Sequence, residues 1–204
     1  MSELTRSLRL PPPAGHPDSA QAMMRDVLVA LTPALAMAVF FFGPRALLLT
    51  AVSVVSCVLF EGAYRRFTHQ SDTRRDLSAC VTGLLLALSL PASAPYWAPV
   101  LGAAFAIVVV KQFYGGLGKN FMNPALGARC FLLISFAPIM TNFTCDAYTG
   151  ATPLAAVKAG ENVNVLDMVI GRTAGTIGET SMLCIVLGAC LLIWLEIIDL
   201  RIPA

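Results

Sequence analysis

The chain has 204 residues, of which 57% are hydrophobic and 13% are charged, and its formal net charge at pH 7 is +2. Soluble domains contain about 45–50% apolar and about 25% charged residues, so this composition excludes an ordinary soluble domain. The net charge itself says little, because the positions of the charges matter more. The apolar residues fall in long runs, which predicts an all-α, polytopic transmembrane helical bundle that contacts membrane lipid and no nucleic acid.

Hydropathy predicts about six membrane spans. Several are shorter than the roughly 20 residues that cross about 30 Å of hydrocarbon, so re-entrant or broken helices are expected among them. We expect residues 1–26 to form a cytoplasmic N-terminal segment and residues 27–204 to form the transmembrane domain. In chain order the spans are Val27–Phe42, Ala46–Tyr64, Leu77–Leu90, Trp97–Val110, Ala125–Met140 and Ser181–Ile198.

The distribution of basic residues predicts the orientation of the spans. If every span crosses, the rule places the N-terminus in the cytoplasm and a loop at about residues 141–180 outside; if one short span is re-entrant, the parity changes. Arg45 and Arg172 fall on the outer side, so the rule is followed by majority. The residues on the inner side are Arg6, Arg9, Arg25, Arg65, Arg66, Arg74, Arg75, Lys111, Lys119 and Arg201.

Cysteine and histidine patterns do not indicate a metal centre. The chain has six cysteines with no C-x-x-C pair, and its two histidines, His16 and His69, lie in polar segments. We therefore expect no metal or iron–sulfur site held by this chain alone, and cysteines that act as small buried hydrophobes.

Polar residues near span ends have both structural and functional interpretations. Glu61 is either an ion-path carboxylate or part of an interfacial ion pair, and the adjacent Arg65 and Arg66 favour the ion pair. Asp76 is expected to cap the third helix, and Asn123 the fifth, where Pro124 suits the first turn. Arg129 either snorkels to lipid headgroups or helps the helix start to hold an anionic or carbonyl-bearing ligand.

Two glycine-containing segments also need interpretation. The run from Gly115 to Asn120 lacks the spacing of a phosphate-binding loop and predicts a sharp turn with close backbone approach. The run from Gly175 to Ser181 predicts a helix start at Thr180 or Ser181, with Glu179 near its positive end; alternatively it forms a polar floor beside the loop at Thr152.

The loop from Asp146 to Leu154 is a polar stretch in an apolar chain. Thr149-Gly150 is typical of a turn, and Thr152-Pro153 is typical of a helix start. The alternative is that the loop presents the Thr152 hydroxyl to a modifying enzyme or a cofactor phosphate.

Four blocks of the chain together resemble the RnfD/NqrB family of membrane subunits. They are Thr82–Pro91, Lys111–Ala125 with its pattern K-Q-x-x-G-G-L-G-x-N-x-x-N-P-A, Thr149–Thr152, and Gly178–Ser181. The resemblance runs from about Arg25 to Pro203. Family members continue with further membrane helices, so we expect residues 27–204 to be the first part of a larger domain.

The resemblance implies a covalent FMN whose phosphate is esterified to Thr152. Thr149, Gly150 and Ala151 complete the attachment motif, and Asp146 matches the acid that a flavin transferase recognises. Arg129 and Glu179 are further candidate flavin contacts, and riboflavin is a candidate second flavin. The family site faces the outer side of a bacterial or archaeal cytoplasmic (inner) membrane, which agrees with the topology above.

The function that the resemblance implies is electron transfer within an Rnf-type complex, which couples ferredoxin:NAD oxidoreduction to Na+ or H+ translocation. The expected partners are the subunits RnfA, RnfB, RnfC, RnfE and RnfG, and the chain would carry electrons without being catalytic alone. The short N-terminal extension favours the Rnf branch. The alternatives are an NqrB-like subunit of the Na+-translocating NADH:quinone reductase, a non-redox transporter or channel-like subunit, and a structural subunit.

Overall fold

The computed structural model describes residues 20–69, 76–116, 118–143, 153–160, 169, 171, 175–179, 181–195 and 197–198. Within these residues the named elements are all helices, which confirms the predicted all-α class. In chain order they are α1 (Ala20–Phe42), α2 (Pro44–Phe67), α3 (Ser78–Leu88), α4 (Trp97–Ala104), the π-helix η2 (Phe105–Gln112), α5 (Pro124–Ser135), α6 (Ala137–Met140), α7 (Pro153–Lys158), the 3₁₀-helix η3 (Ile177–Glu179) and α9 (Met182–Trp194).

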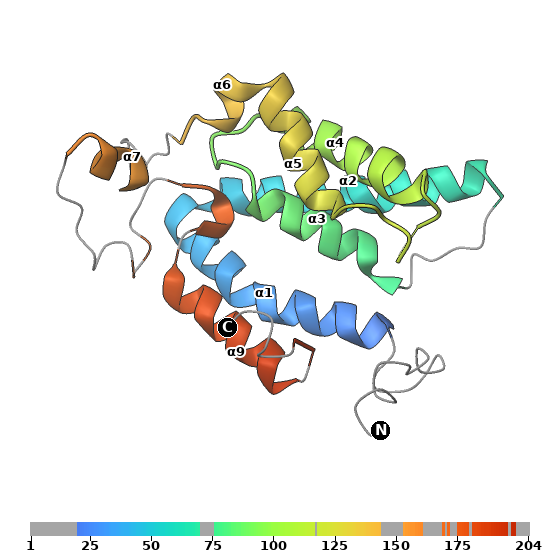
Figure 1. The fold of residues 1–204 in the computed structure, drawn as a ribbon, viewed down its shortest axis with the longest axis horizontal. Coiled ribbons are helices and arrows are strands. Elements are labelled where there is room, and N and C mark those ends of the chain that lie inside the picture. The colour runs from blue at the N-terminus through green and yellow to red at the C-terminus, as the bar shows by residue number, and fades with distance from the viewer. Residues whose placement is uncertain are drawn as a thin grey trace, which may run out of the picture.

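The pair α2 and α3 forms the centre of the bundle. Helix α4, η2 and α5 pack on one side of this pair, and α1 packs on the other side, with α9 lying along α1 (Figure 1). Two clusters of buried apolar residues form the core. One joins α2, α3, η2 and α5 around Leu86 and Leu132, and the other joins α1, α2, α3 and η3 around Leu49 and Ile177.

Each of the six predicted spans corresponds to helix in the structure. By length and composition, α1 and α2 are long and apolar enough to cross a membrane. The other apolar helices are shorter, and α4 runs directly into η2 from Trp97 to Gln112. Between α5 and α6 the chain leaves helical geometry at Phe136. Pro138 explains this break, because its ring has no N–H to donate and clashes with the carbonyl four residues earlier.

Predicted helix ends are partly confirmed. The Asn123 side chain accepts a 3.0 Å hydrogen bond from the Ala125 amide, so Asn123 caps α5 as predicted. The prediction that Asp76 caps α3 is wrong. Leu77 is the N-cap residue, with φ of 57°, and its apolar side chain makes no capping bond. Ser181 is the N-cap residue of α9, but its side chain does not make a capping bond either.

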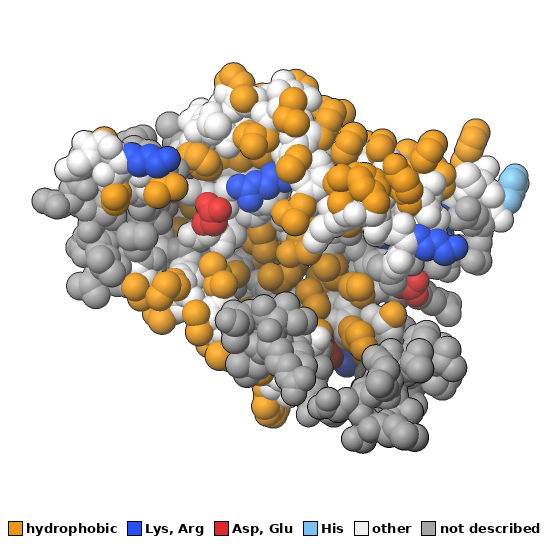
Figure 2. Space-filling view, viewed as in Figure 1, with side chains coloured by type: hydrophobic (Ala, Val, Ile, Leu, Met, Phe, Trp, Pro, Cys, Tyr) orange, Lys and Arg blue, Asp and Glu red, His pale blue; other side chains and the backbone are white. Residues whose placement is uncertain are grey.

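The bundle has a predominantly apolar exterior. Figure 2 shows hydrophobic side chains spread across the viewed face, with few charged side chains among them. Helix α9 is an example, since it packs along α1 and its residues Met182, Leu183 and Leu187 are all exposed. A surface of this kind suits lipid rather than water.

Helices α2 and α3 approach closely at Gly83. The Ser53 hydroxyl donates a 2.7 Å hydrogen bond to the Gly83 carbonyl, and a Cβ at position 83 would lie 2.7 Å from the Val54 Cα. Small residues at helix contacts allow such approach in membrane proteins.

We predict that Gly83→Ala destabilises the bundle by about 1–3 kcal/mol, the usual range for overpacking, because the new methyl group meets backbone that cannot move aside. Gly102→Ala is the matched control, since its Cβ would meet the side chains of Leu132 and Leu86, which can shift. Denaturant unfolding in detergent measures both variants. Equal loss of stability in the two would contradict the packing argument.

Candidate functional site

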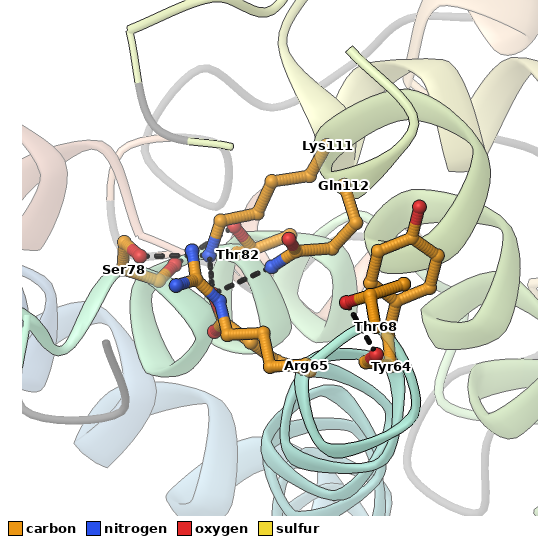
Figure 3. Close-up of polar contacts among 8 residues, drawn as sticks. Tyr64, Arg65, Thr68, Ser78, Thr82, Lys111 and Gln112 are labelled. Carbon is orange, nitrogen blue, oxygen red and sulfur yellow. Dashed lines mark hydrogen bonds and ion pairs between the residues drawn. The ribbon is translucent and has the colours of Figure 1, made fainter. Parts of the chain in front are cut away.

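A cluster of polar side chains lies inside the bundle where α2, α3 and η2 meet (Figure 3). The Lys111 ammonium group donates to Glu61 Oε1 at 2.8 Å and to Ser78 Oγ at 2.7 Å. Gln112 Nε2 donates to the same Glu61 oxygen at 2.9 Å. The Arg65 guanidinium lies 3.7 Å from that oxygen, which is an ion-pair distance but too long for a hydrogen bond. We call Glu61, Arg65, Ser78, Lys111 and Gln112 the Glu61 cluster.

The charges of the cluster are almost completely removed from solvent. Glu61 and Lys111 are each 1% exposed, and Gln112 is 3% exposed. Removing an ion from water costs several kcal/mol unless it is paired and hydrogen-bonded, so neither ion would be stable here alone. The cluster is therefore a costly polar feature of an apolar bundle, and such features inside membrane helices usually mark function.

The π-helical segment η2 supplies two adjacent members of the cluster. Lys111 and Gln112 are its last residues, and both bond to one carboxylate oxygen. Adjacent residues of an α-helix point about 100° apart, and a π-helical turn widens the helix at this point. π-Helical turns occur often at functional sites, which agrees with the position of η2.

The glycine-containing turn after η2 covers the cluster. Gly115, Gly116 and Gly118 have φ of 102°, 89° and 83°. A Cβ at position 116 would lie 3.2 Å from an Arg65 guanidinium nitrogen. With its amide nitrogen facing the turn, Asn120 donates to the carbonyls of Lys111 and Gly116. The predicted sharp turn and close backbone approach are both confirmed.

Two oxygen atoms of the cluster have no hydrogen-bond partner within the described part of the chain. They are Glu61 Oε2 and Gln112 Oε1, and both are buried. Buried acceptors are nearly always satisfied in proteins, so these two oxygens need a donor such as water or a proton, or a cation. The arrangement can thus accept a small charged species beside a fixed ion pair.

A cavity of about 350 Å³ adjoins the cluster, since Ser78 and Lys111 line both. Its volume lies in the range of small-molecule sites, about 300–1,000 Å³. Its walls combine apolar side chains with a few polar groups. The remaining lining residues are Met24, Val81, Thr82, Leu85, Gly118, Asn120, Met122, Asn123 and Pro124.

The structure describes only two of the predicted flavin residues, Arg129 and Glu179. Asp146, Thr149, Gly150, Ala151 and Thr152 lie outside the described residues. Arg129 is half-buried in α5 and does not line the cavity.

Glu179 belongs to η3 and is exposed, and its Oε2 accepts a 3.3 Å hydrogen bond from the Thr176 amide. Neither Arg129 nor Glu179 belongs to the Glu61 cluster.

Three sequence-based interpretations need correction. Glu61 does pair with Arg65 at 3.7 Å, but the pair is buried inside the bundle, and the closer cation is the buried Lys111 of η2 at 2.8 Å. Lys111 therefore does not contribute a loop charge to the topology argument. Helix continues through Lys111 and Gln112, two residues beyond the predicted end of the fourth span at Val110. Cysteines are not uniformly buried either: Cys57 is buried, whereas Cys130 and Cys190 are exposed.

Comparison with known proteins relates the chain to one family. Residues 9–204 match the NQR2, RnfD, RnfE family. The chain is 44% identical over 212 residues to the D subunit of the Na(+)-translocating ferredoxin:NAD(+) oxidoreductase complex of Acetobacterium woodii, covering all of this chain and 67% of that protein.

Two further relatives carry similar names. The chain is 34% identical over 203 residues to the D subunit of the proton-translocating ferredoxin:NAD(+) oxidoreductase complex of Clostridium ljungdahlii, covering 91% of this chain and 61% of that protein. It is 42% identical over 138 residues to the D subunit of the ion-translocating oxidoreductase complex of Yersinia enterocolitica, covering 67% of this chain and 39% of that protein. The chain thus spans two thirds or less of the length of these curated relatives.

We predict that Lys111→Met destabilises the protein by about 3–5 kcal/mol, because it leaves the Glu61 carboxylate buried without its cation. Adding Glu61→Gln should restore part of that loss, since the unpaired carboxylate is removed while the Arg65 guanidinium, 8% exposed, stays charged. Denaturant unfolding of the two single variants and the double variant in detergent gives the coupling free energy. Lys119→Met is the control, because Lys119 is exposed in the nearby turn. Additive effects of the two cluster substitutions would contradict the ion pair.

Proposed function

Because the chain belongs to the NQR2, RnfD, RnfE family, we propose that it is a membrane electron-transfer subunit of an ion-translocating ferredoxin:NAD oxidoreductase complex. The observation that carries this proposal is the similarity, over the whole chain, to one named component of such a complex. The K-Q-x-x-G-G-L-G-x-N-x-x-N-P-A block supports it structurally, because this block supplies Lys111, Gln112 and the covering turn of the Glu61 cluster. The proposed partners are the subunits RnfA, RnfB, RnfC, RnfE and RnfG.

We further propose that Thr152 carries FMN through a phosphoester bond. A bound flavin takes up one electron or two, so it can connect single-electron iron–sulfur donors with acceptors that need electron pairs. The chain supplies the Thr152 hydroxyl as the anchor and Asp146, Thr149, Gly150 and Ala151 as the sequence that a flavin transferase recognises. Arg129 and Glu179 remain predictions as additional flavin contacts.

The orientation we propose places the Thr152 segment on the outer side of the cytoplasmic membrane. Asn142 and Ile177, which flank that segment, contact the turn between α3 and α4. The same turn contacts Arg45 at the start of α2. Glu61 lies 16 residues further along α2, a distance of about 24 Å at 1.5 Å per residue. The Glu61 cluster and the turn between α3 and α4 therefore lie at opposite ends of α2, and in the proposed orientation the cluster end faces the cytoplasm.

The Glu61 cluster is our candidate for the part of this subunit that handles a translocated ion. Ion movement through a membrane protein needs groups that stabilise charge away from water. Glu61 has one oxygen committed to Lys111 and Gln112, and the other is unsatisfied within the described residues. That second oxygen can accept a proton or contact Na+.

The cavity beside Lys111 is our candidate site for riboflavin as a second, non-covalent flavin. Its volume suits a small molecule of mixed polarity. The polar lining residues Ser78, Thr82 and Asn123 can hydrogen-bond the edge of a ring system, and Val81, Leu85 and Met122 can pack on its faces. The residues present therefore fit a group of this kind.

We predict that Thr152→Val abolishes covalent flavin and leaves the bundle folded, because valine lacks the hydroxyl that forms the ester. In-gel fluorescence of the denatured protein, after expression with an active flavin transferase, measures the flavin, and mass analysis of the peptide spanning Thr152 locates it.

Thr141→Val is the matched control, since Thr141 is exposed and its hydroxyl donates to the Ala137 carbonyl within the same helical turn. An unmodified Thr152 in the wild-type protein would refute the electron-carrier proposal and favour a non-redox transporter-like subunit. Persistence of covalent flavin in Thr152→Val would refute the attachment site.

We predict that Val81→Phe lowers non-covalent flavin content at least tenfold without changing covalent flavin, because the larger ring occupies the cavity. Chromatography of an acid extract measures the non-covalent flavin. Val109→Phe is the control, since Val109 is exposed on η2 and does not line the cavity. Full retention of riboflavin in Val81→Phe would place it elsewhere.

A further inference from the structure

The cavity beside the Glu61 cluster has a cation in its wall. Lys111 lines the cavity although its side chain is only 1% exposed, and it extends toward Ser78, which lines the same wall (Figure 3). An ammonium group has three N–H donors, and within the described residues Lys111 uses one for Glu61 and one for Ser78. The third donor therefore remains for a ligand in the cavity.

The charges around the cavity do not cancel. The Glu61 cluster contains two cations, Lys111 and Arg65, and one carboxylate, Glu61, so its formal charge is +1 (2 − 1). No acidic residue is among the described residues that line the cavity, and Asp26 and Asp76, which neighbour lining residues in the sequence, are not part of the wall. Excess buried charge costs free energy, and an anion in the cavity would offset it.

Two helices begin at the same cavity. Ser78 is the first residue of α3 and Pro124 is the first residue of α5, and both line the wall. The unpaired amides at the start of a helix carry partial positive charge, which favours an anion nearby. Asn123 caps α5 with its side-chain oxygen, which leaves its NH₂ group as a further donor at the wall. The helix ends thus add to the field of Lys111.

We infer that this cavity selects planar ligands that carry a negative charge, and that Lys111 is the residue that determines this selectivity. The apolar lining residues Val81, Leu85 and Met122 offer surface for the faces of a ring, and the ammonium group meets its charged edge. Charge-assisted hydrogen bonds of this kind are about twice as strong as neutral ones. A neutral ligand of the same shape lacks that interaction and is bound more weakly.

The inference deepens the proposed riboflavin site and rests on the proposed function only for the identity of the natural ligand. Two electrons and one proton added to a neutral flavin ring leave it with one negative charge. In the proposed complex these electrons come from reduced ferredoxin. Lys111 therefore favours the reduced ring over the oxidised ring, which raises the midpoint potential of a flavin in this cavity.

The test measures the binding of two probes to the complete complex in detergent, after its non-covalent flavin has been removed by dialysis. Naphthoate is a planar anion, and naphthamide is a neutral molecule of nearly the same shape. Equilibrium dialysis gives the affinity of each probe. Val81→Phe fills the cavity and supplies the background, so specific binding is the difference between wild type and this variant.

Three further variants separate the ammonium group in the wall from the total charge of the cluster. The double variant Lys111→Met with Glu61→Gln removes the ammonium group but keeps the formal charge at +1, from Arg65 alone. Glu61→Gln alone keeps Lys111 and raises the formal charge to +2. Lys119→Met is the control, because it removes an exposed cation of the nearby turn that does not line the cavity.

We expect wild type to bind naphthoate at least about tenfold more tightly than naphthamide, the scale of one hydrogen bond to a charged group. The double variant should lose about tenfold in naphthoate affinity and keep its naphthamide affinity, whereas Glu61→Gln should bind naphthoate more tightly than wild type. Lys119→Met should match wild type. In flavin-loaded complex, the double variant should lower the midpoint potential of the non-covalent flavin by about 30 mV, which is a tenfold change for two electrons.

Equal affinity of wild type for the two probes, or no specific binding of either, would overturn the inference. Unchanged naphthoate affinity in the double variant would do the same. If that variant does not insert, Glu61→Gln decides, since naphthoate affinity that fails to increase there contradicts the role of Lys111. Absence of non-covalent flavin from wild type as purified would instead refute the riboflavin site, and selective binding of naphthoate would still support the anion-selective cavity.

Discussion

The ion pair between Lys111 and Glu61 is the constraint on which this end of the bundle depends. In an apolar bundle each charge is tolerable only beside the other, so α2 and η2 must meet in one register. Ser78 brings the start of α3 to the same point through the lysine. The glycine-containing turn then covers the arginine of the cluster, since a Cβ at Gly116 would lie only 3.2 Å from the Arg65 guanidinium.

The two ends of the bundle have different physical characters. The end with the Glu61 cluster has buried charges next to a cavity. At the other end, the turn between α3 and α4 makes hydrogen bonds to Asn142 through the Ser93 hydroxyl and to Ile177 through the Leu90 carbonyl. Under the proposed function, an ion is stabilised at the first end. The α2–α3 pair connects the two ends and packs closely at Gly83.

Some predictions about single residues were confirmed and others were wrong. The outcome depended on the local backbone conformation and on how far apart in the sequence the interacting residues lie. Asn123 caps α5 because its side chain meets an amide only two residues away. Asp76 offered the same chemistry, but Leu77 adopts a left-handed conformation and becomes the N-cap residue of α3. Lys111 was expected in a loop because a lysine usually ends an apolar run, and its buried acidic partner lies 50 positions earlier, beyond any local pattern.

By itself, the sequence determined the all-α class, the six apolar spans, the turn after Gln112 and the family, because hydrophobicity, turn chemistry and motif spacing are local properties of the chain. Tertiary structure alone decided which charges are buried, that Lys111 rather than Arg66 pairs with Glu61, and that one turn contacts both Asn142 and Ile177. Those contacts join residues 49 to 87 positions apart (142 − 93 and 177 − 90), and only the packing of whole helices brings such residues within hydrogen-bonding distance.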